Sequence, residues 1–138
     1  MSATSPTEPL GELSPNDQLM GILGSLRERV LGVRDSVLST VDGLLVVADT
    51  DDVHPESVAA LAAATLGVGR RMADQAGVGA LREVVARCGS GHVVVVAVGE
   101  RALLTVMGDD GMDIATFQRE SPAMVEALNK VLAADVAQ

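Results

Sequence analysis

The sequence predicts an α/β protein of the α+β type, with one five-stranded, mostly antiparallel sheet sandwiched by helices. Three observations carry this prediction. The 138 residues fit a single domain. Apolar residues recur at helical spacing near both ends of the chain and in an alanine-rich run between them. Five short runs rich in β-branched residues lie among these helices, separated by turns that contain glycine. The expected order of elements is therefore αββαβββα.

The first helix is expected to start at Ser14, which can cap it, with Pro15 at the first helical position and Asp17 in the favoured first turn. Four apolar residues follow at helical spacing before Gly32, which is expected to end the helix: Leu19, Leu23, Leu26 and Val30. Residues 1–13 are rich in Ser, Thr, Pro and Glu and bury too little apolar area to offset the cost of ordering. We therefore expect a disordered tail at 1–13 and a folded domain at 14–138.

Two β-rich runs, Arg34–Thr40 and Leu44–Asp49, flank an Asp-Gly pair, which is a strong signal for a hairpin. After the middle helix, three further runs predict a meander: Leu81–Cys88, His92–Val98 and Arg101–Met107. The second of these is apolar on both faces, as a central strand covered by helices on both sides would be.

The middle helix, expected from Pro55 to about Ala76, has almost no polar face. A surface helix normally has one apolar stripe and one charged side. The stripe here is Val58, Leu61, Ala62, Thr65, Val68 and Met72, and the other side is Ala59, Ala60, Ala63, Ala64, Leu66 and Gly67. Since the sheet covers only one side, a second copy of the chain is expected to cover the other. The predicted dimer contacts are Ala60, Ala63, Ala64 and Gly67 on this helix, with Val84, Val85 and Ala86 on an edge strand that pairs with its twin.

The last helix is expected from about Asp113 to Ala134, and Pro122 inside it predicts either a kink or a fresh start at Ser121. Its apolar residues are Ile114, Phe117, Met124, Leu128 and Val131.

Composition excludes several classes of function. Ten basic against nineteen acidic residues give a net charge of −9, and basic residues cluster only at Arg70–Arg71, so nucleic-acid binding is not expected. No apolar stretch is long enough for a membrane span, and the first residues lack the pattern of a signal peptide. A single cysteine permits no disulfide within the chain, which favours a cytoplasmic setting.

No motif indicates catalysis, a cofactor or a metal. His54 and His92 lie far apart without other ligands nearby, and Cys88 has no clear base. The glycines in Gly67–Arg71 lie inside a helix and lack the lysine of a phosphate loop, so they are interpreted as close packing. The aspartates of two loops, Asp49, Asp51, Asp52, Asp109 and Asp110, are interpreted as solvated turn residues.

The chain resembles the Roadblock/LC7 family over roughly residues 15 to 134. Three segments carry the resemblance, in this order: VLGVRDSVLSTVDGLLVVAD, ESVAALAAATLGVGRRMA and GHVVVVAVGERALLTVM. The resemblance implies the αββαβββα fold and a homodimer in which middle helices and third strands pair about a two-fold axis. It also implies a small Ras-like GTPase as partner, with a sensor-kinase-like protein often encoded beside bacterial members.

The function expected from these observations is a non-enzymatic homodimeric scaffold that binds and regulates a small Ras-like GTPase in a bacterial signalling system. Arg70 and Arg71 are candidates for the partner contact, because charge returns there at the end of an apolar helix; the alternative is a solvated helix end. A second hypothesis is a structural subunit of a larger signalling or motility assembly without effect on nucleotide turnover. A third is an enzyme using Cys88, or a small-molecule sensor.

Overall fold

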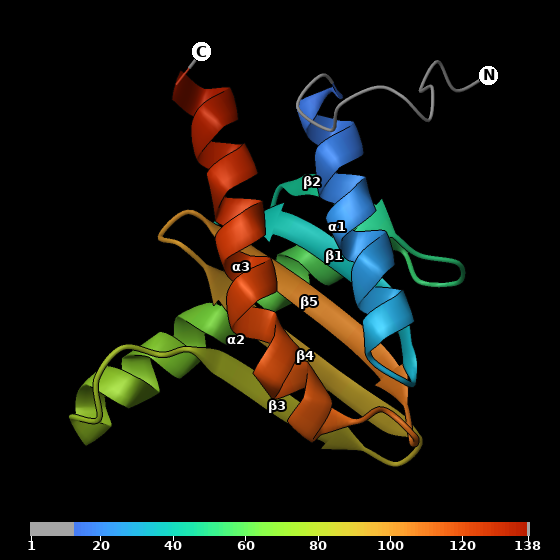
Figure 1. The fold of residues 1–138 in the computed structure, drawn as a ribbon. Helices are drawn as coiled ribbons and strands as arrows, with labels where there is room; N and C mark the ends of the chain where they lie inside the picture. Colours follow the sequence, from blue (N-terminus) through green and yellow to red (C-terminus); the bar gives the residue numbers. More distant parts are fainter. Residues whose placement is uncertain (1–12, 138) are drawn as a thin grey trace.

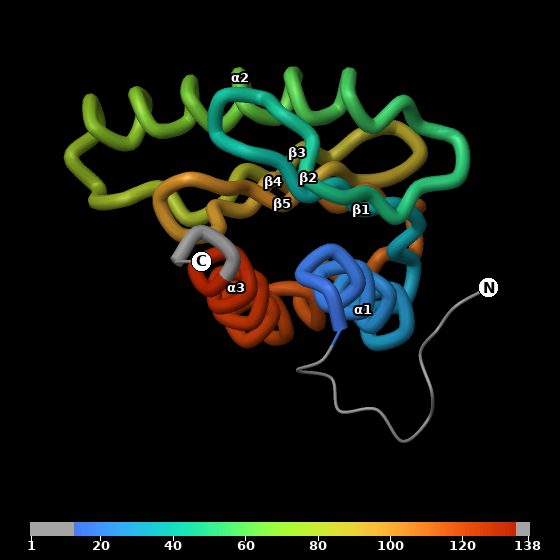
Figure 2. The backbone as a smooth tube through the Cα atoms, turned by 90° about the horizontal axis from the view of Figure 1, so that it is seen from above, coloured from blue at the N-terminus to red at the C-terminus, as the bar shows by residue number. Residues whose placement is uncertain are grey.

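The computed structural model describes residues 13–137, and these form three layers. Figure 2 shows α2 alone on one face of the sheet, with α1 and α3 side by side on the other. The elements are α1 (Pro15–Arg29), β1 (Val33–Thr40), β2 (Leu45–Asp49), α2 (Pro55–Ala76), β3 (Glu83–Cys88), β4 (Gly91–Val98), β5 (Ala102–Asp109) and α3 (Ile114–Ala137). The predicted class and the order αββαβββα are confirmed (Figure 1). The predicted tail lies outside the described residues except for Leu13.

The five strands lie in the order β2-β1-β5-β4-β3, and every neighbouring pair is antiparallel. The last strand in the sequence, β5, therefore lies at the centre, between β1 and β4. Strands β2 and β3 are the two edges, and α2 carries the chain from one edge to the other across the face of the sheet (Figure 1).

Helix α1 begins as predicted, with the backbone N–H of Asp17 donating to Ser14 Oγ at 3.1 Å. Its end differs from the prediction, because the helix stops at Arg29 and Val30 is the C-cap. Gly32 lies in the turn between α1 and β1, where it adopts a φ of +89°. The backbone there lies so close to Met112 that a Cβ on Gly32 would be 2.5 Å from the Met112 backbone.

The predicted hairpin is confirmed, and Gly43 supplies the left-handed φ of +92° that its turn requires. Strand β3 starts two residues later than predicted. Leu81 instead packs against the small cluster under α2, so it does not join the strand ladder. Strand β5 is displaced toward its C-terminal end relative to the prediction and runs to Asp109.

Helix α3 runs without interruption through Pro122, so the fresh start near that residue is not observed. Pro122 lies on the exposed side of the helix. Three buried residues on the opposite side, Phe117, Met124 and Leu128, pack into the same core before and after the proline. This shared packing stabilises one continuous helix although the proline has no N–H to donate to it.

The hydrophobic core is unevenly divided between the two faces of the sheet. The large cluster lies under α1 and α3 and includes Leu23, Val30, Leu104 and Phe117. The cluster under α2 consists of four buried residues, Ala62, Leu66, Val95 and Leu103. Helix α2 is therefore attached to the sheet through a narrow strip of small and medium side chains.

Candidate protein-interaction surface

Helix α2 packs on its sheet through one strip of residues and exposes both small and large aliphatic residues on its other side. Ala59, Ala62 and Leu66 are at most 4 % exposed. Leu61, Val68 and Met72 are 69, 57 and 67 % exposed. Three of the predicted dimer contacts, Ala60, Ala64 and Gly67, are also exposed, and Ala63 is half-buried. The side toward the sheet therefore combines alanines with Leu66, and alanines also occur on the exposed side.

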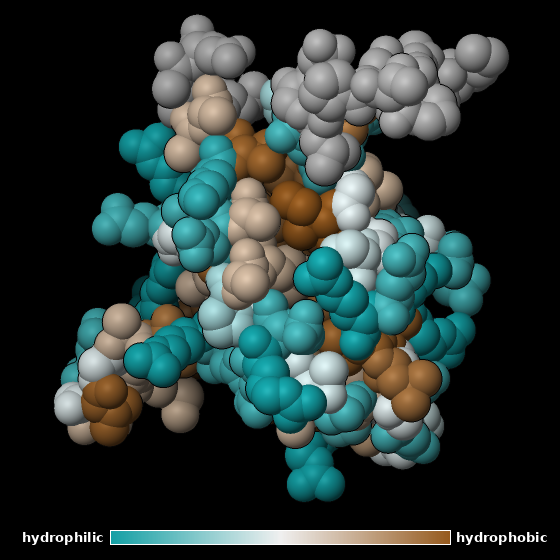
Figure 3. Space-filling view, in the orientation of Figure 1, coloured by the Kyte–Doolittle hydropathy of each residue, from teal (hydrophilic) through white to brown (hydrophobic). Residues whose placement is uncertain are grey.

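The exposed stripe forms one wall of an apolar groove of about 710 Å³ between α2 and edge strand β3. Thr65, Val68 and Met72 line it from α2. Leu81 and Val84 line it from the sheet side, and Val78 lies where the two walls meet. Hydrophobic colour also stands out in Figure 3 at the C-terminal end of α2, at the lower left. An apolar surface of this kind, continuous over two elements, is typical of protein–protein contacts.

Gly69 sets the depth of this groove. A Cβ on Gly69 would lie 2.8 Å from Leu81 Cδ2 and 3.1 Å from Val84 Cγ2. The packing role predicted for Gly67 or Gly69 therefore belongs to Gly69, since Gly67 has no such neighbour within 4 Å. The missing side chain brings α2 down onto the start of β3 and joins helix and strand in one surface.

Strand β3 completes the surface as an unpaired edge. It pairs with β4 on one side, from Glu83 opposite Val96 to Cys88 opposite Gly91, and with no described strand on the other. Val84 is half-buried, while Val85 and Ala86 are exposed. The edge expected from the sequence is thus present, and its open backbone groups lie beside the groove.

The four predicted contact residues on α2 lie in different environments. Ala64 lines the groove. Ala63 packs against the cluster under α2, and Ala60 lies next to the turn at Gly43. Gly67 is exposed. The groove residues Val68, Met72 and Val78 are not among the predicted contacts, although the helical spacing of Leu61, Thr65, Val68 and Met72 forms a continuous stripe in the sequence.

Neither Arg70 nor Arg71 lines the groove. Arg70 is half-buried and lines a shallow depression with Asp74, Gly99 and Glu100. Arg71 is exposed. Neither forms an ion pair with another described residue. Both guanidinium groups are therefore available at the margin of the helix.

The polar side chains of the described residues do not form a catalytic arrangement. Cys88 and His92 lie near each other in the hairpin, but Cys88 is paired with Gly91 and His92 with Arg87, so their side chains point to opposite faces of the sheet. His54 contacts Ser57 Oγ at 3.3 Å and Glu56 at 3.7 Å, all exposed. Within residues 13–137, no group of three His, Cys, Asp or Glu side chains is arranged to hold a metal ion.

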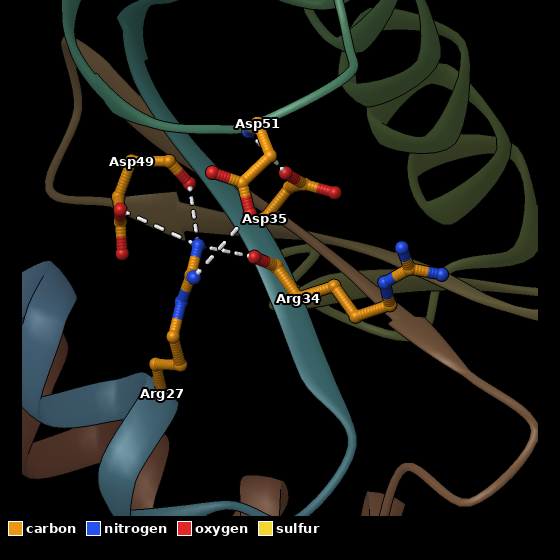
Figure 4. Close-up of polar contacts among 5 residues, drawn as sticks. All are labelled: Arg27, Arg34, Asp35, Asp49 and Asp51. Carbon is orange, nitrogen blue, oxygen red and sulfur yellow. Dashed lines mark hydrogen bonds and ion pairs between the residues drawn. The ribbon is translucent and has the colours of Figure 1, made fainter.

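The aspartates of the first acidic loop are partly engaged by α1. Figure 4 shows Arg27 reaching from α1 to Asp49 at the end of β2 and to the following Asp51. Asp35 on β1 accepts a hydrogen bond from the backbone N–H of Asp51 at 3.0 Å. These contacts tie β2 and the loop after it to the neighbouring elements, so this edge of the sheet is held in place by side chains.

One carboxyl group departs clearly from its ordinary titration. The pKa of Asp113 is lowered, first by the hydrogen bond from the Thr116 hydroxyl and then by that from the Thr116 backbone N–H. Asp113 precedes α3 and caps its first turn. Its role is structural.

Among the helices at residues 13–137, none combines the length and the apolar character needed to cross a bilayer.

Comparison with known proteins identifies the fold. The Roadblock/LC7 domain model matches residues 21–107. No curated protein matches the sequence. A Roadblock/LC7 domain from Streptomyces avermitilis is 26 % identical, with a TM-score of 0.76, over 82 % of this chain and 96 % of that one.

Two further structures share the fold at lower identity. The gliding protein MglB from Thermus thermophilus is 19 % identical, with a TM-score of 0.75 over 93 % of this chain and 97 % of that one. MglB from Myxococcus xanthus is 13 % identical, with a TM-score of 0.78 over 97 and 96 %. The family match spans more than half of the chain. This chain belongs to the Roadblock/LC7 domain family.

Proposed function

We propose that this chain is a non-enzymatic homodimeric scaffold of the bacterial cytoplasm that binds and regulates a small Ras-like GTPase. The observation that carries the proposal is the apolar groove between α2 and the open edge of β3. The groove supplies exposed apolar side chains, including Val68 and Met72, and the strand edge beside it supplies unpaired backbone groups. Together these two features can form an extended interface. The family assignment supports the choice of partner.

The second copy is the occupant that fits the groove best. An isologous two-fold contact brings the same patch from both subunits together, so exposed aliphatic side chains of one α2 meet those of the other. The same axis places one β3 beside its twin and removes the open edge. The predicted contact residues Ala64 and Val84 line this groove, and Val85 and Ala86 belong to its strand.

The dimer is tested by light scattering on the wild type and on Val68→Glu. We expect a dimeric wild type at micromolar concentration and a monomeric variant, because the charge would be buried without a partner. Arg71→Glu is the matched control, because Arg71 is exposed and does not line the groove, and it is expected to remain dimeric. A monomeric wild type would contradict the proposal. Hydrogen exchange adds a local readout, with slow exchange expected for Val84–Ala86 only in the dimer.

The GTPase is proposed to dock on the outer surface of the paired α2 helices, with Arg70 and Arg71 at the margin. Rim charges mainly set the rate of encounter and its salt dependence. Reversal of both arginines is therefore expected to weaken the complex most at low salt and to leave the dimer intact. The decisive measurement is calorimetric titration of the dimer with the GTPase encoded beside it, in GDP and GTP-analogue states. The absence of a complex in both states contradicts the GTPase partner.

The alternative function is that of a structural subunit in a larger signalling or motility assembly. It is favoured if the dimer forms but no GTPase binds, and a sensor-kinase-like protein is then the first partner to test by pulldown from the native cell. No turnover of GTP by the isolated chain is expected under either function, because the sequence has no phosphate loop and its one lysine is Lys130.

A further inference from the structure

The edge strand β3 presents opposite charges at its two ends on one face. Cross-strand pairing with β4 shows that Glu83, Val85 and Arg87 share the face covered by α3, because their neighbours there are Val96, Val94 and His92. Val84, Ala86 and Cys88 share the face of α2. On the α3 face, the Glu83 carboxylate, Val85 and the Arg87 guanidinium therefore occupy alternate positions along the strand, with Val85 in the middle.

Glu83 accepts a hydrogen bond from α3, while Arg87 forms no ion pair with another residue of the described part of the chain. Gln118 Nε2 on α3 donates to Glu83 Oε2 at 2.8 Å, which leaves the second carboxylate oxygen free. Arg87 is exposed and makes no ion pair within the described part of the chain. The strand therefore carries one oriented carboxylate and one unengaged guanidinium, separated by Val85.

We propose that β3 recognises a second copy of itself in a single register, with Val85 on the two-fold axis and Glu83 opposite the partner's Arg87. The proposal rests on the homodimer described above and specifies how its strands pair. In antiparallel strands related by a two-fold axis perpendicular to the sheet, one residue lies opposite its own twin. With Val85 at that point, both Glu83–Arg87 pairs form at once across the interface.

The neighbouring registers lack this match. Placing Val84 on the axis sets Glu83 opposite the partner's Val85, and placing Ala86 there sets Arg87 opposite the partner's Val85. Each leaves the charges facing apolar side chains. In the proposed register the α2 face has Val84 opposite the partner's Ala86, so the pairs next to the two-fold axis on that face are apolar. Cross-strand pairs of opposite charge stabilise a sheet, and like charges directly opposite destabilise it.

Two charge reversals test the pairing. Glu83→Lys sets Lys opposite Arg twice, and Arg87→Glu sets Glu opposite Glu twice, so each variant alone is expected to self-associate at least about tenfold more weakly. In a heterodimer of the two variants, positions 83 and 87 again face unlike charges in both pairs across the interface. Native mass spectrometry of the two variants together is therefore expected to show a heterodimer well above its statistical share.

Matched controls separate the pairing from local effects. Gln118→Ala removes the hydrogen bond to Glu83 but keeps both charges, and it is expected to remain dimeric. Arg82→Glu reverses a neighbouring charge that lies opposite the partner's Cys88, and it is expected neither to block self-association nor to prefer Glu83→Lys as a partner.

Symmetric cysteines give an independent measure of the register. In a Cys88→Ser background, Val85→Cys is expected to form an intersubunit disulfide under mild oxidation, because only the residue on the axis lies next to its twin. Val84→Cys and Ala86→Cys are expected to stay reduced. A dimeric wild type whose charge variants mix statistically, or whose disulfide forms at Val84 or Ala86, overturns the register alone. A monomeric wild type overturns the homodimer and the register together.

Discussion

Arg27 Nη2 lies 3.3 Å from Asp49 Oδ1, and this ion pair joins α1 to the last residue of β2. The same guanidinium donates to the backbone oxygens of Arg34 and Asp49, so one side chain links a helix to two adjacent strands. The edge at β2 is therefore tied to the body of the domain, in contrast to the open edge at β3.

Arg27→Ala is expected to lower the free energy of unfolding by about 1 kcal/mol, because both side chains are partly exposed and solvent screens the pair. Urea denaturation of Arg27→Ala, Asp49→Ala and the double variant measures the coupling. A coupling energy near zero would show that the arginine acts only through its backbone hydrogen bonds. Hydrogen exchange should also become faster in β2 while β4 is unaffected.

Gly32→Ala is expected to destabilise the domain by roughly 3 kcal/mol. The φ of +89° disfavours alanine, and its Cβ would lie 2.5 Å from the Met112 backbone, which cannot rotate away. Gly21→Ala is the control, since nothing lies within 4 Å of its new Cβ and alanine favours helix α1. Thermal unfolding should show a lower Tm for the first variant and an unchanged or slightly higher one for the second.

Phe117→Ala is expected to cost about 3–5 kcal/mol of stability, because this fully buried ring fills the core under α1 and α3. Phe117→Leu keeps most of the volume and should cost less than about 1.5 kcal/mol. Chemical denaturation measures both. Similar losses for the two variants would show that ring shape, rather than buried volume, determines the packing there.

Asp113 should make stability depend on pH in acid. Its folded pKa lies below the ordinary value of 3.8, so its contribution is fully present above that value and is lost as the pH falls through the lowered pKa. NMR titration should place its midpoint below 3.8. Thr116→Val removes the hydroxyl donor and should raise the Asp113 pKa; an unchanged midpoint would contradict this cause.

Local signals account for the elements that the sequence predicted. Ser14 and Pro15 mark the start of α1, Gly43 marks the first hairpin, and Gly77 ends α2 in a left-handed conformation. Each is a property of adjacent residues, so no knowledge of the tertiary fold was needed. The errors at the ends of β3 and β5 are of one or two residues, where packing rather than propensity decides.

The candidate surface was only partly predictable. The sequence indicated that α2 is covered on both sides, but its alanines and glycines fit either a sheet or another helix, so they did not reveal which side faces inward. The side of α2 that faces the sheet depends on tertiary contacts such as the close approach of Gly69 to Leu81 and Val84. The pair of Arg27 and Asp49 was also missed, because residues so far apart in the chain are brought together only by the fold.

The central place of β5 has a consequence for how the chain reaches this structure. Strand β1 hydrogen-bonds to residues that are made roughly 70 positions later, so the N-terminal hairpin leaves the ribosome without its inner neighbour. Nearly all the sheet must be synthesised before its two halves can join. We therefore expect a high contact order, slow folding for a domain of this length, and a period during synthesis when β1 is open to wrong pairing or to a chaperone.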